Sequence, residues 1–225
     1  MVDQELAGII LLTVPPALLF CMTAVFSQLE NLLGRERGYL LGFGIYWLVW
    51  CLAVPLLLLG GKGFVSMFEQ STPLFSRSSI LAFIVFVLVP AVAVLMYGRE
   101  FVNSPLRLIA VAVPAAVLNG FCEEVLWRGM FVSVFPENAW LAVVYPAAGF
   151  ALWHLAPQQV ISSGSRTGFI LSTFVLGLAY GLIAYQTGSP FWPAVSHSAS
   201  GIVALGGAVA PSFLAWLDGR DVRAS

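Results

Sequence analysis

The sequence contains long and nearly uninterrupted apolar runs, and this feature limits the possible folds more than any other. Seven runs are candidate membrane spans, at residues 6–26, 39–60, 79–97, 108–135, 140–156, 168–186 and 190–217. A transmembrane helix needs about 20 mainly apolar residues. The runs do not alternate between apolar and polar residues, so they predict helices rather than barrel strands. We expect an all-α, polytopic bundle of about seven to eight spans.

Composition agrees with a membrane-embedded chain and excludes some partners. The chain is 60% hydrophobic and only 9% charged, whereas soluble domains carry roughly 25% charged residues. Its formal net charge is −1 and it has no cluster of Lys or Arg, so we expect no nucleic-acid partner. Membrane lipid is the expected surrounding, and residues 1–225 are expected to form one integral membrane domain.

The distribution of basic residues predicts an orientation, because cytoplasmic loops carry an excess of Lys and Arg. One set of alternate loops holds seven arginines, against Lys62 and Arg77 in the other set. We therefore expect the N-terminus outside and the C-terminus in the cytoplasm, in the inner membrane of a bacterium. The seven arginines are Arg35, Arg37, Arg99, Arg107, Arg166, Arg220 and Arg223.

The fourth run contains three charged residues within six positions: Glu123, Glu124 and Arg128. Such groups are costly in a bilayer and usually face the bundle interior or a wet cavity. Glu124 and Arg128 are four residues apart, with the acid first, which favours an ion pair on one helix face. Glu123 lies about 100° around the helix, on a face shared with Asn119. Arg128 can therefore neutralise one carboxylate and leave Glu123 for acid–base chemistry.

The only two histidines, His154 and His197, also lie in apolar runs. Together with Glu123 they suit two kinds of chemistry. In one, Glu123 and His154 deprotonate a water and His197 stabilises an oxyanion. In the other, all three bind zinc and leave a fourth position for water. Spacing alone does not separate these two schemes.

Three motifs in order resemble one known family. They are Glu-Glu-x-x-x-Arg at 123–128, Phe-x-x-x-His at 150–154, and the histidine at 197. These resemble the motifs of the CPBP family, the CAAX protease and bacteriocin-processing (Abi) family of intramembrane endopeptidases. The resemblance covers about residues 105–205 and implies a helical bundle whose motifs line a cavity.

The resemblance also implies roles for these residues. Glu123 would activate water with His154, and His197 would stabilise the oxyanion. Glu124 and Arg128 match the other positions of the first motif. The resemblance favours a glutamate-type mechanism without a cofactor over a metalloprotease, in which Glu123, His154 and His197 would hold zinc.

One position departs from the family pattern. The residue four after the third-motif histidine is usually Asn or Asp, but here it is Gly201, which has no side-chain donor. Ser200 or Asn119 could replace that donor. Otherwise the chain would be a catalytically silent immunity or binding member, and a Glu/His proton-coupled transporter is a further alternative.

The expected reaction is hydrolysis of a peptide bond in a membrane-associated or C-terminal-tail substrate. In the predicted topology the fourth run enters from the cytoplasm, which places Glu123 about 23 Å along it. His197 lies near the outer end of its run. These positions favour an active site in the outer half of the membrane and an exported peptide or tail as substrate.

Overall fold

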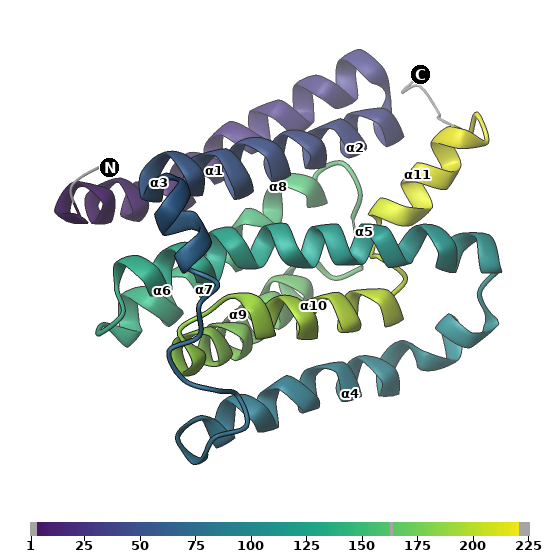
Figure 1. Ribbon diagram of the computed structural model, residues 1–225. Helices are drawn as coiled ribbons and strands as arrows, with labels where there is room; N and C mark the ends of the chain where they lie inside the picture. Colours follow the sequence, from purple (N-terminus) through teal and green to yellow (C-terminus); the bar gives the residue numbers. More distant parts are fainter. Residues whose placement is uncertain (1–3, 163, 221–225) are drawn as a thin grey trace.

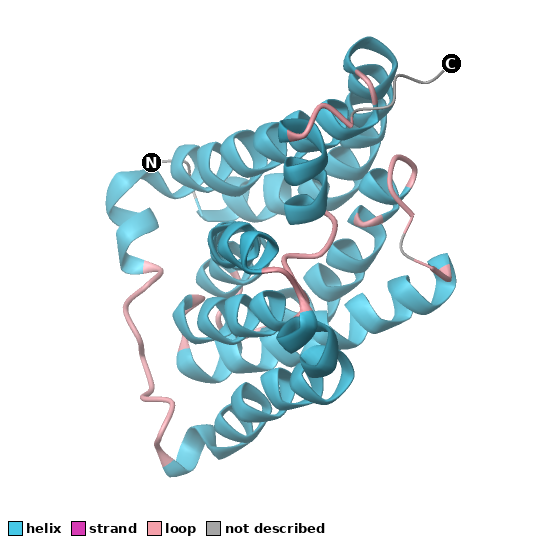
Figure 2. Ribbon diagram, turned by 90° about the vertical axis from the view of Figure 1, so that its right-hand side faces the viewer, coloured by secondary structure: helices cyan, strands magenta, loops and turns pink. Residues whose placement is uncertain are grey.

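The structure is a computed structural model that describes residues 4–162 and 164–220. Within these residues the chain forms helices and connections, and no strand (Figures 1 and 2). Six helical segments are long and apolar enough to cross a membrane, which confirms the all-α membrane bundle. They are Glu5–Leu33, Arg35–Ser66, Arg77–Asn103, Leu106–Val134, Trp140–Gln158 and Arg166–Thr187.

The first two segments form a helical hairpin. Helix α1 (Gln4–Leu33) ends at Gly34, whose φ of 86° breaks the helix. The chain then returns as α2 (Arg35–Ile45), the π-helical segment η1 (Tyr46–Ala53) and α3 (Val54–Ser66). Pro55 follows η1 and has no N–H group, so the preceding turn widens instead of closing a normal helical bond.

A long connection over residues 67–76 runs along the outside of the bundle to the next hairpin (Figure 2). This hairpin consists of the short 3₁₀ turn η2 (Arg77–Ser79), α4 (Ile80–Asn103) and α5 (Leu106–Glu124). Helix α5 continues through the π-helical segment η3 (Val125–Met130) into α6 (Phe131–Val134). A π-helical widening inside an α-helix is often associated with a functional site, and this one directly follows the two glutamates.

The fifth segment comprises η4 (Trp140–Val144), α7 (Tyr145–Trp153) and α8 (Leu155–Gln158). Its main helix ends at Trp153, so His154 lies at the junction with α8. Helix α9 (Arg166–Thr187) then crosses back to the end where α7 began.

The last apolar run is not one span. It forms α10 (Phe191–Val203) and α11 (Val209–Leu217). Between them Leu205, Gly206 and Gly207 all have positive φ, at 57°, 69° and 58°. This left-handed backbone interrupts the helix, so residues 190–217 hold two helices instead of the single span expected above.

The successive segments alternate in direction, so their connections gather at two ends of the bundle (Figure 1). One end contains the α1–α2 and α4–α5 junctions, the start of α9 and the end of α11. An ion pair of 2.7 Å between Arg107 and Asp218 joins α5 to the end of α11 there. Six of the seven arginines counted above lie at this arginine-rich end, while Arg223 lies outside the described residues.

Candidate functional site

The site forms where α5 packs closely against α10. A Cβ atom on Gly120 would lie 2.7 Å from Ser198 Oγ and 2.9 Å from Ser198 N. Only glycine permits this approach, because real Cβ atoms do not come so near to backbone. The contact brings His197 of α10 next to the glutamate pair of α5. Small residues in the first motif region therefore position a residue of the third motif.

Glu123 is 1% exposed and accepts hydrogen bonds from neutral groups. Asn119 Nδ2 donates to Oε2 at 3.0 Å, and Tyr46 Oη and Trp153 Nε1 each donate to Oε1 at 3.4 Å. No arginine or lysine contacts this carboxylate among the described residues. Glu123 also lines a cavity, so its carboxylate can accept a proton from a molecule bound there.

Glu124 is equally buried but has a charged partner. Arg128 Nη1 donates to its Oε1 at 3.0 Å, as the four-residue spacing predicts. The same guanidinium donates to the Gly177 carbonyl at 3.4 Å and lies over the Phe150 ring, 4.5 Å from its centroid. Such a buried pair compensates the cost of removing both charges from water. Glu124 is therefore engaged in structure rather than open to the cavity.

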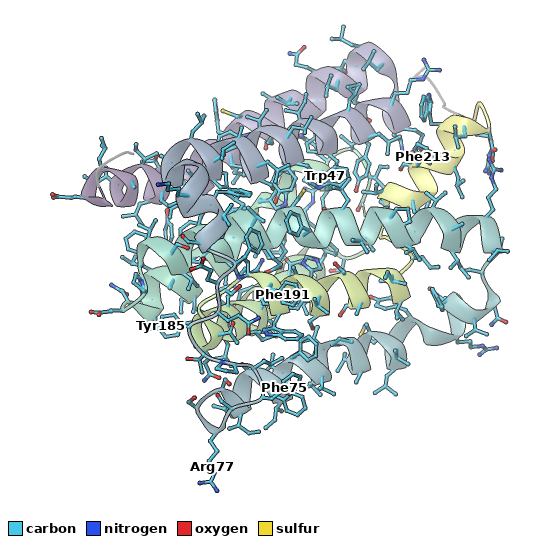
Figure 3. All side chains as sticks on the ribbon, viewed as in Figure 1. Trp47, Phe75, Arg77, Tyr185, Phe191 and Phe213 are labelled. Atoms are coloured by element: carbon cyan, nitrogen blue, oxygen red, sulfur yellow. The ribbon has the colours of Figure 1, made fainter. Side chains whose placement is uncertain are left out.

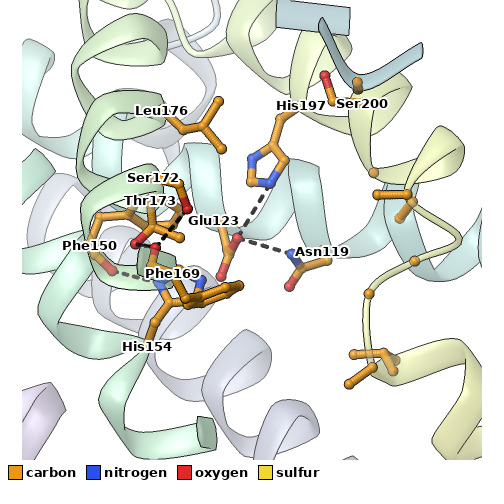
Figure 4. A pocket seen from close by; sticks show the side chains of 18 of the residues that line it. Asn119, Glu123, Phe150, His154, Phe169, Ser172, Thr173, Leu176, His197 and Ser200 are labelled. Carbon is orange, nitrogen blue, oxygen red and sulfur yellow. Dashed lines mark hydrogen bonds and ion pairs between the residues drawn. The ribbon is translucent and has the colours of Figure 1, made fainter. Parts of the chain in front are cut away.

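His197 bridges the two glutamates (Figure 4). Its Nδ1 donates to Glu124 Oε1 at 2.8 Å, and its Nε2 lies 3.7 Å from Glu123 Oε2. The imidazole stacks on the Tyr180 ring, with centroids 4.9 Å apart and planes inclined by 15°. The two carboxylates are thus less separate than the helix geometry alone predicts, because one histidine contacts both.

His154 lies on the other side of the cavity from His197 (Figure 4). Its Nδ1 is 2.7 Å from the Phe150 carbonyl oxygen. A carbonyl only accepts, so Nδ1 carries the proton and the neutral ring keeps a lone pair on Nε2. No hydrogen bond joins His154 directly to Glu123 among the bonds that the described residues make.

A cavity of about 670 Å³ connects these groups. Glu123, His154, His197, Asn119 and Ser200 all line it, so the structure brings the predicted site residues to one space. Glu124 and Arg128 are behind this surface. The remaining walls are mainly apolar and come from α2, α4, α9 and the connection before α11.

The cavity extends from Glu123 toward the arginine-rich end. Its walls include Met96 of α4 and Leu171 and Val175 of α9, which are 64%, 61% and 63% exposed. The cavity therefore opens sideways between α4 and α9, on the arginine-rich side of Glu123. The outer-half location of the site stays a prediction. Glu123 does lie deep, about 25 Å along its segment from Leu106. Depth along one helix fixes where the site is, but the surrounding helices determine where it opens.

The three residues named above as possible zinc ligands do not form a ready site. Within residues 4–162 and 164–220, no group of three or more His, Cys, Asp or Glu side chains is placed to hold a metal ion. The Nδ1 atoms of His197 and His154 face Glu124 and the Phe150 carbonyl, so only their Nε2 atoms could serve as ligands. The zinc scheme stays a prediction.

Sequence reasoning missed the aromatic donors around Glu123. Tyr46 and Trp153 bond it directly, and Trp127 Nε1 donates to Tyr46 Oη at 2.8 Å. Trp47 Nε1 donates to Asn119 Oδ1 at 3.0 Å. Tyr and Trp are typical of membrane interfaces. When they occur in the middle of a span, their O–H or N–H group needs a buried hydrogen-bond partner, so these residues could have indicated a polar site.

The glycine at position 201, where the resembled family usually has Asn or Asp, also has a structural explanation. A Cβ at this position would lie 3.1 Å from Ala116 Cβ, tighter than most contacts, so close packing of α10 on α5 favours glycine. Ser200 lines the cavity, but its hydroxyl donates to the Ser196 carbonyl at 2.8 Å.

Residues 105–203 match the protein family described as "Type II CAAX prenyl endopeptidase Rce1-like". The match spans all three motifs and nearly coincides with the core expected at 105–205. No curated protein and no solved structure gave a match.

Proposed function

We propose that this integral membrane chain, whose residues 105–203 belong to the Rce1-like endopeptidase family, hydrolyses a peptide bond with Glu123 as general base. The observation that carries the proposal is a buried carboxylate that faces a cavity, has no arginine or lysine partner among the described residues and lies between two histidines. Buried polar groups in membrane spans usually mark function rather than packing.

The reaction begins with a water held between Glu123 and His154 Nε2. Glu123 takes one proton, and the resulting hydroxide adds to the carbonyl carbon of the substrate. The carbonyl π electrons move to the oxygen, which becomes an oxyanion. His197, as an imidazolium with Nδ1–H on Glu124, directs Nε2–H to that oxygen. The C–N bond then breaks, and the protonated Glu123 returns its proton to the leaving amine.

The charges of this arrangement are balanced. The scheme uses both glutamates as carboxylates and His197 as an imidazolium, so that two negative charges meet the two positive charges of Arg128 and His197. A neutral set of this kind reduces the cost of holding charge away from water. The proposal is accordingly of the glutamate type, in which no metal takes part.

Removal of metal tests that part of the proposal. Purified protein dialysed against a chelator should retain its rate, and added zinc should not raise it. A rate that disappears on chelation and returns with zinc would instead support the metalloprotease scheme. Zinc content of the purified protein provides an independent measurement.

The substrate would enter from the arginine-rich end, which the positive-inside rule makes cytoplasmic. The exposed apolar side chains of α4 and α9 at the cavity opening suit a segment that remains in lipid. We therefore propose a membrane-associated peptide or C-terminal tail as substrate, presented from the cytoplasmic side, in place of an exported one.

Comparison of membrane-protein termini tests the function and identifies the substrate. Cells that produce the parent chain are compared with cells that produce Glu123→Ala at the same level. New termini that appear only with the parent chain support the proposal and give the cleavage site. If every terminus persists with Glu123→Ala, the endopeptidase proposal is wrong. Protection of cells by both forms would then favour a silent immunity role.

A further inference from the structure

The side-chain amide of Asn119 is a hydrogen-bond donor at the cavity that the reaction above does not use. We infer that this amide is a second donor to the oxyanion, beside His197, and that Trp47 fixes its orientation. The inference rests on the proposed endopeptidase function. It assigns a catalytic contact to a residue of α5 that precedes the first motif by one helical turn.

Trp47 determines which end of the amide faces the site. It points from η1 toward α5 (Figure 3), and its Nε1 lies 3.0 Å from Asn119 Oδ1. The indole N–H can only donate, so the amide oxygen must face Trp47. The NH₂ group then faces Glu123 and the cavity, with Nδ2 at 3.0 Å from Glu123 Oε2. One N–H bonds the carboxylate and the second is available.

Two donors therefore converge on one oxygen. Asn119 Nδ2 lies 3.0 Å from Glu123 Oε2, and His197 Nε2 lies 3.7 Å from the same atom. They come from α5 and α10, and both line the cavity (Figure 4). A negative charge that arises beside Oε2 would be within reach of both groups after small side-chain movements.

The reaction moves the charge in this way. Before the water is deprotonated, the negative charge is on Glu123, and both donors stabilise it. When Glu123 takes the proton it becomes neutral, and the negative charge appears on the substrate oxygen. The donors lose their anionic acceptor on Glu123 at the step in which the oxyanion forms. They can then transfer to the new anion without a change in the net charge of the site.

Other residues near His197 are less suited to this role. Gly201 has no side chain, and a Cβ at this position would point at Ala116 across the helix contact. Ser200 has a single hydroxyl proton, which it donates to the Ser196 carbonyl at 2.8 Å. Of the two substitutes that the sequence suggests for the missing donor at 201, the hydrogen bonds favour Asn119.

The first experiment measures Asn119→Ala in lipid nanodiscs, with Asn103→Ala as a matched control at the exposed end of α4. The probe is a quenched peptide that carries the cleavage site found by the comparison of termini. Loss of one oxyanion donor should lower kcat by roughly 100-fold and leave KM nearly unchanged. Glu123→Ala, measured in parallel, tests the proposed function itself. If Glu123→Ala is inactive but Asn119→Ala retains full kcat, only the present inference fails.

A pH–rate profile separates the oxyanion role from support of the base. If Asn119 only held Glu123, its loss would move the acidic limb of the profile and leave the plateau rate unchanged. A donor to the oxyanion must lower the plateau itself. An unchanged plateau would therefore overturn the inference even if the rate at one pH had fallen.

A double-mutant cycle tests Trp47 as a positioning residue. Trp47→Phe removes the indole N–H and should lower kcat about fivefold, the factor that a hydrogen bond of typical strength represents. Trp50→Phe, in the same π-helical segment, is the control. In the Asn119→Ala background, Trp47→Phe should have no further effect, because its target is absent. Additive losses would show that Trp47 acts through packing and would overturn its assigned role.

Discussion

Glu123 and Glu124 are adjacent and equally buried, yet they lie in different surroundings. Glu123 faces η1 and α7, where Tyr46 and Trp153 supply neutral donors. Glu124 lies on a neighbouring face of the helix, where Arg128 supplies a positive charge. A rotation of about 100° between neighbouring helix positions is enough to separate them. The comparison teaches that two equally buried carboxylates can differ in chemistry, because a guanidinium holds Glu124, whereas Glu123 has neutral donors and a histidine that can gain or lose a proton.

The largest expected effect comes from neutralising each carboxylate in turn. Glu123→Gln keeps the shape but cannot take a proton, so the rate should fall by roughly 10²–10⁴. Its thermal unfolding should stay close to that of the parent. Glu124→Gln should show the reverse pattern, with a smaller loss of rate and a clear loss of stability. Peptide cleavage and thermal unfolding of both purified variants check this, and equal losses of rate would remove the distinction between the glutamates.

Arg128→Met tests the ion pair between Arg128 and Glu124. It leaves the Glu124 carboxylate buried without its guanidinium, which should destabilise the protein by about 3–5 kcal/mol. Denaturant unfolding in detergent provides the measurement. Arg77→Met is the control, because Arg77 extends away from the bundle (Figure 3). Adding Glu124→Gln to Arg128→Met should recover part of the loss, whereas a further loss of similar size would contradict a paired charge.

Moving the side-chain amide from position 119 of α5 to position 201 of α10 tests whether its location matters. Asn119→Ala removes the amide, and Gly201→Asn supplies another one turn after His197. Ala116→Gly makes room, because a Cβ at position 201 lies 3.1 Å from Ala116 Cβ. The triple variant should recover roughly tenfold in rate over Asn119→Ala. Ala116→Gly with Asn119→Ala alone is the control, and equal rates in the two would show that the position of the amide is not interchangeable.

The smallest effect is expected for an exposed carboxylate with the same kind of partner as Glu124. Asp218 accepts from Arg107 and Arg220, and these bonds hold the pKa of its carboxyl below the usual range. A lowered pKa stabilises the fold above the ordinary carboxyl range, and the contribution disappears as the pH falls through the lowered value. Asp218→Asn should therefore melt slightly lower at neutral pH and no lower in strong acid. A large loss at neutral pH would contradict the weak contribution of surface pairs.

Contacts within one helix could be predicted from the sequence. Helical spacing alone predicts that Glu124 meets Arg128 and that Asn119 shares a face with Glu123, and both contacts are present. The break in the last apolar run was also predictable, because glycines readily adopt the positive φ seen at Gly206 and Gly207. These features depend on local geometry, which a single sequence contains.

Contacts between helices could not be predicted in the same way. The bridge from His197 to both glutamates depends on how far α10 rotates and how closely it approaches at Gly120. Trp47 meets Asn119 across 72 residues of sequence, and nothing in either local pattern identifies the other. The opening of the cavity likewise depends on the separation of α4 and α9, which no apolar run encodes by itself.

The shortness of α10 has a consequence for assembly. Its 13 residues reach about 20 Å, less than the roughly 30 Å hydrocarbon core. This helix is too short to cross the membrane alone, and its place depends on helices that precede it in the chain, α5 above all. His197 therefore joins the site only after α10 has followed α5 out of the ribosome. A chain that contains α5 but not yet α10 would hold the proposed base without the histidine that contacts it.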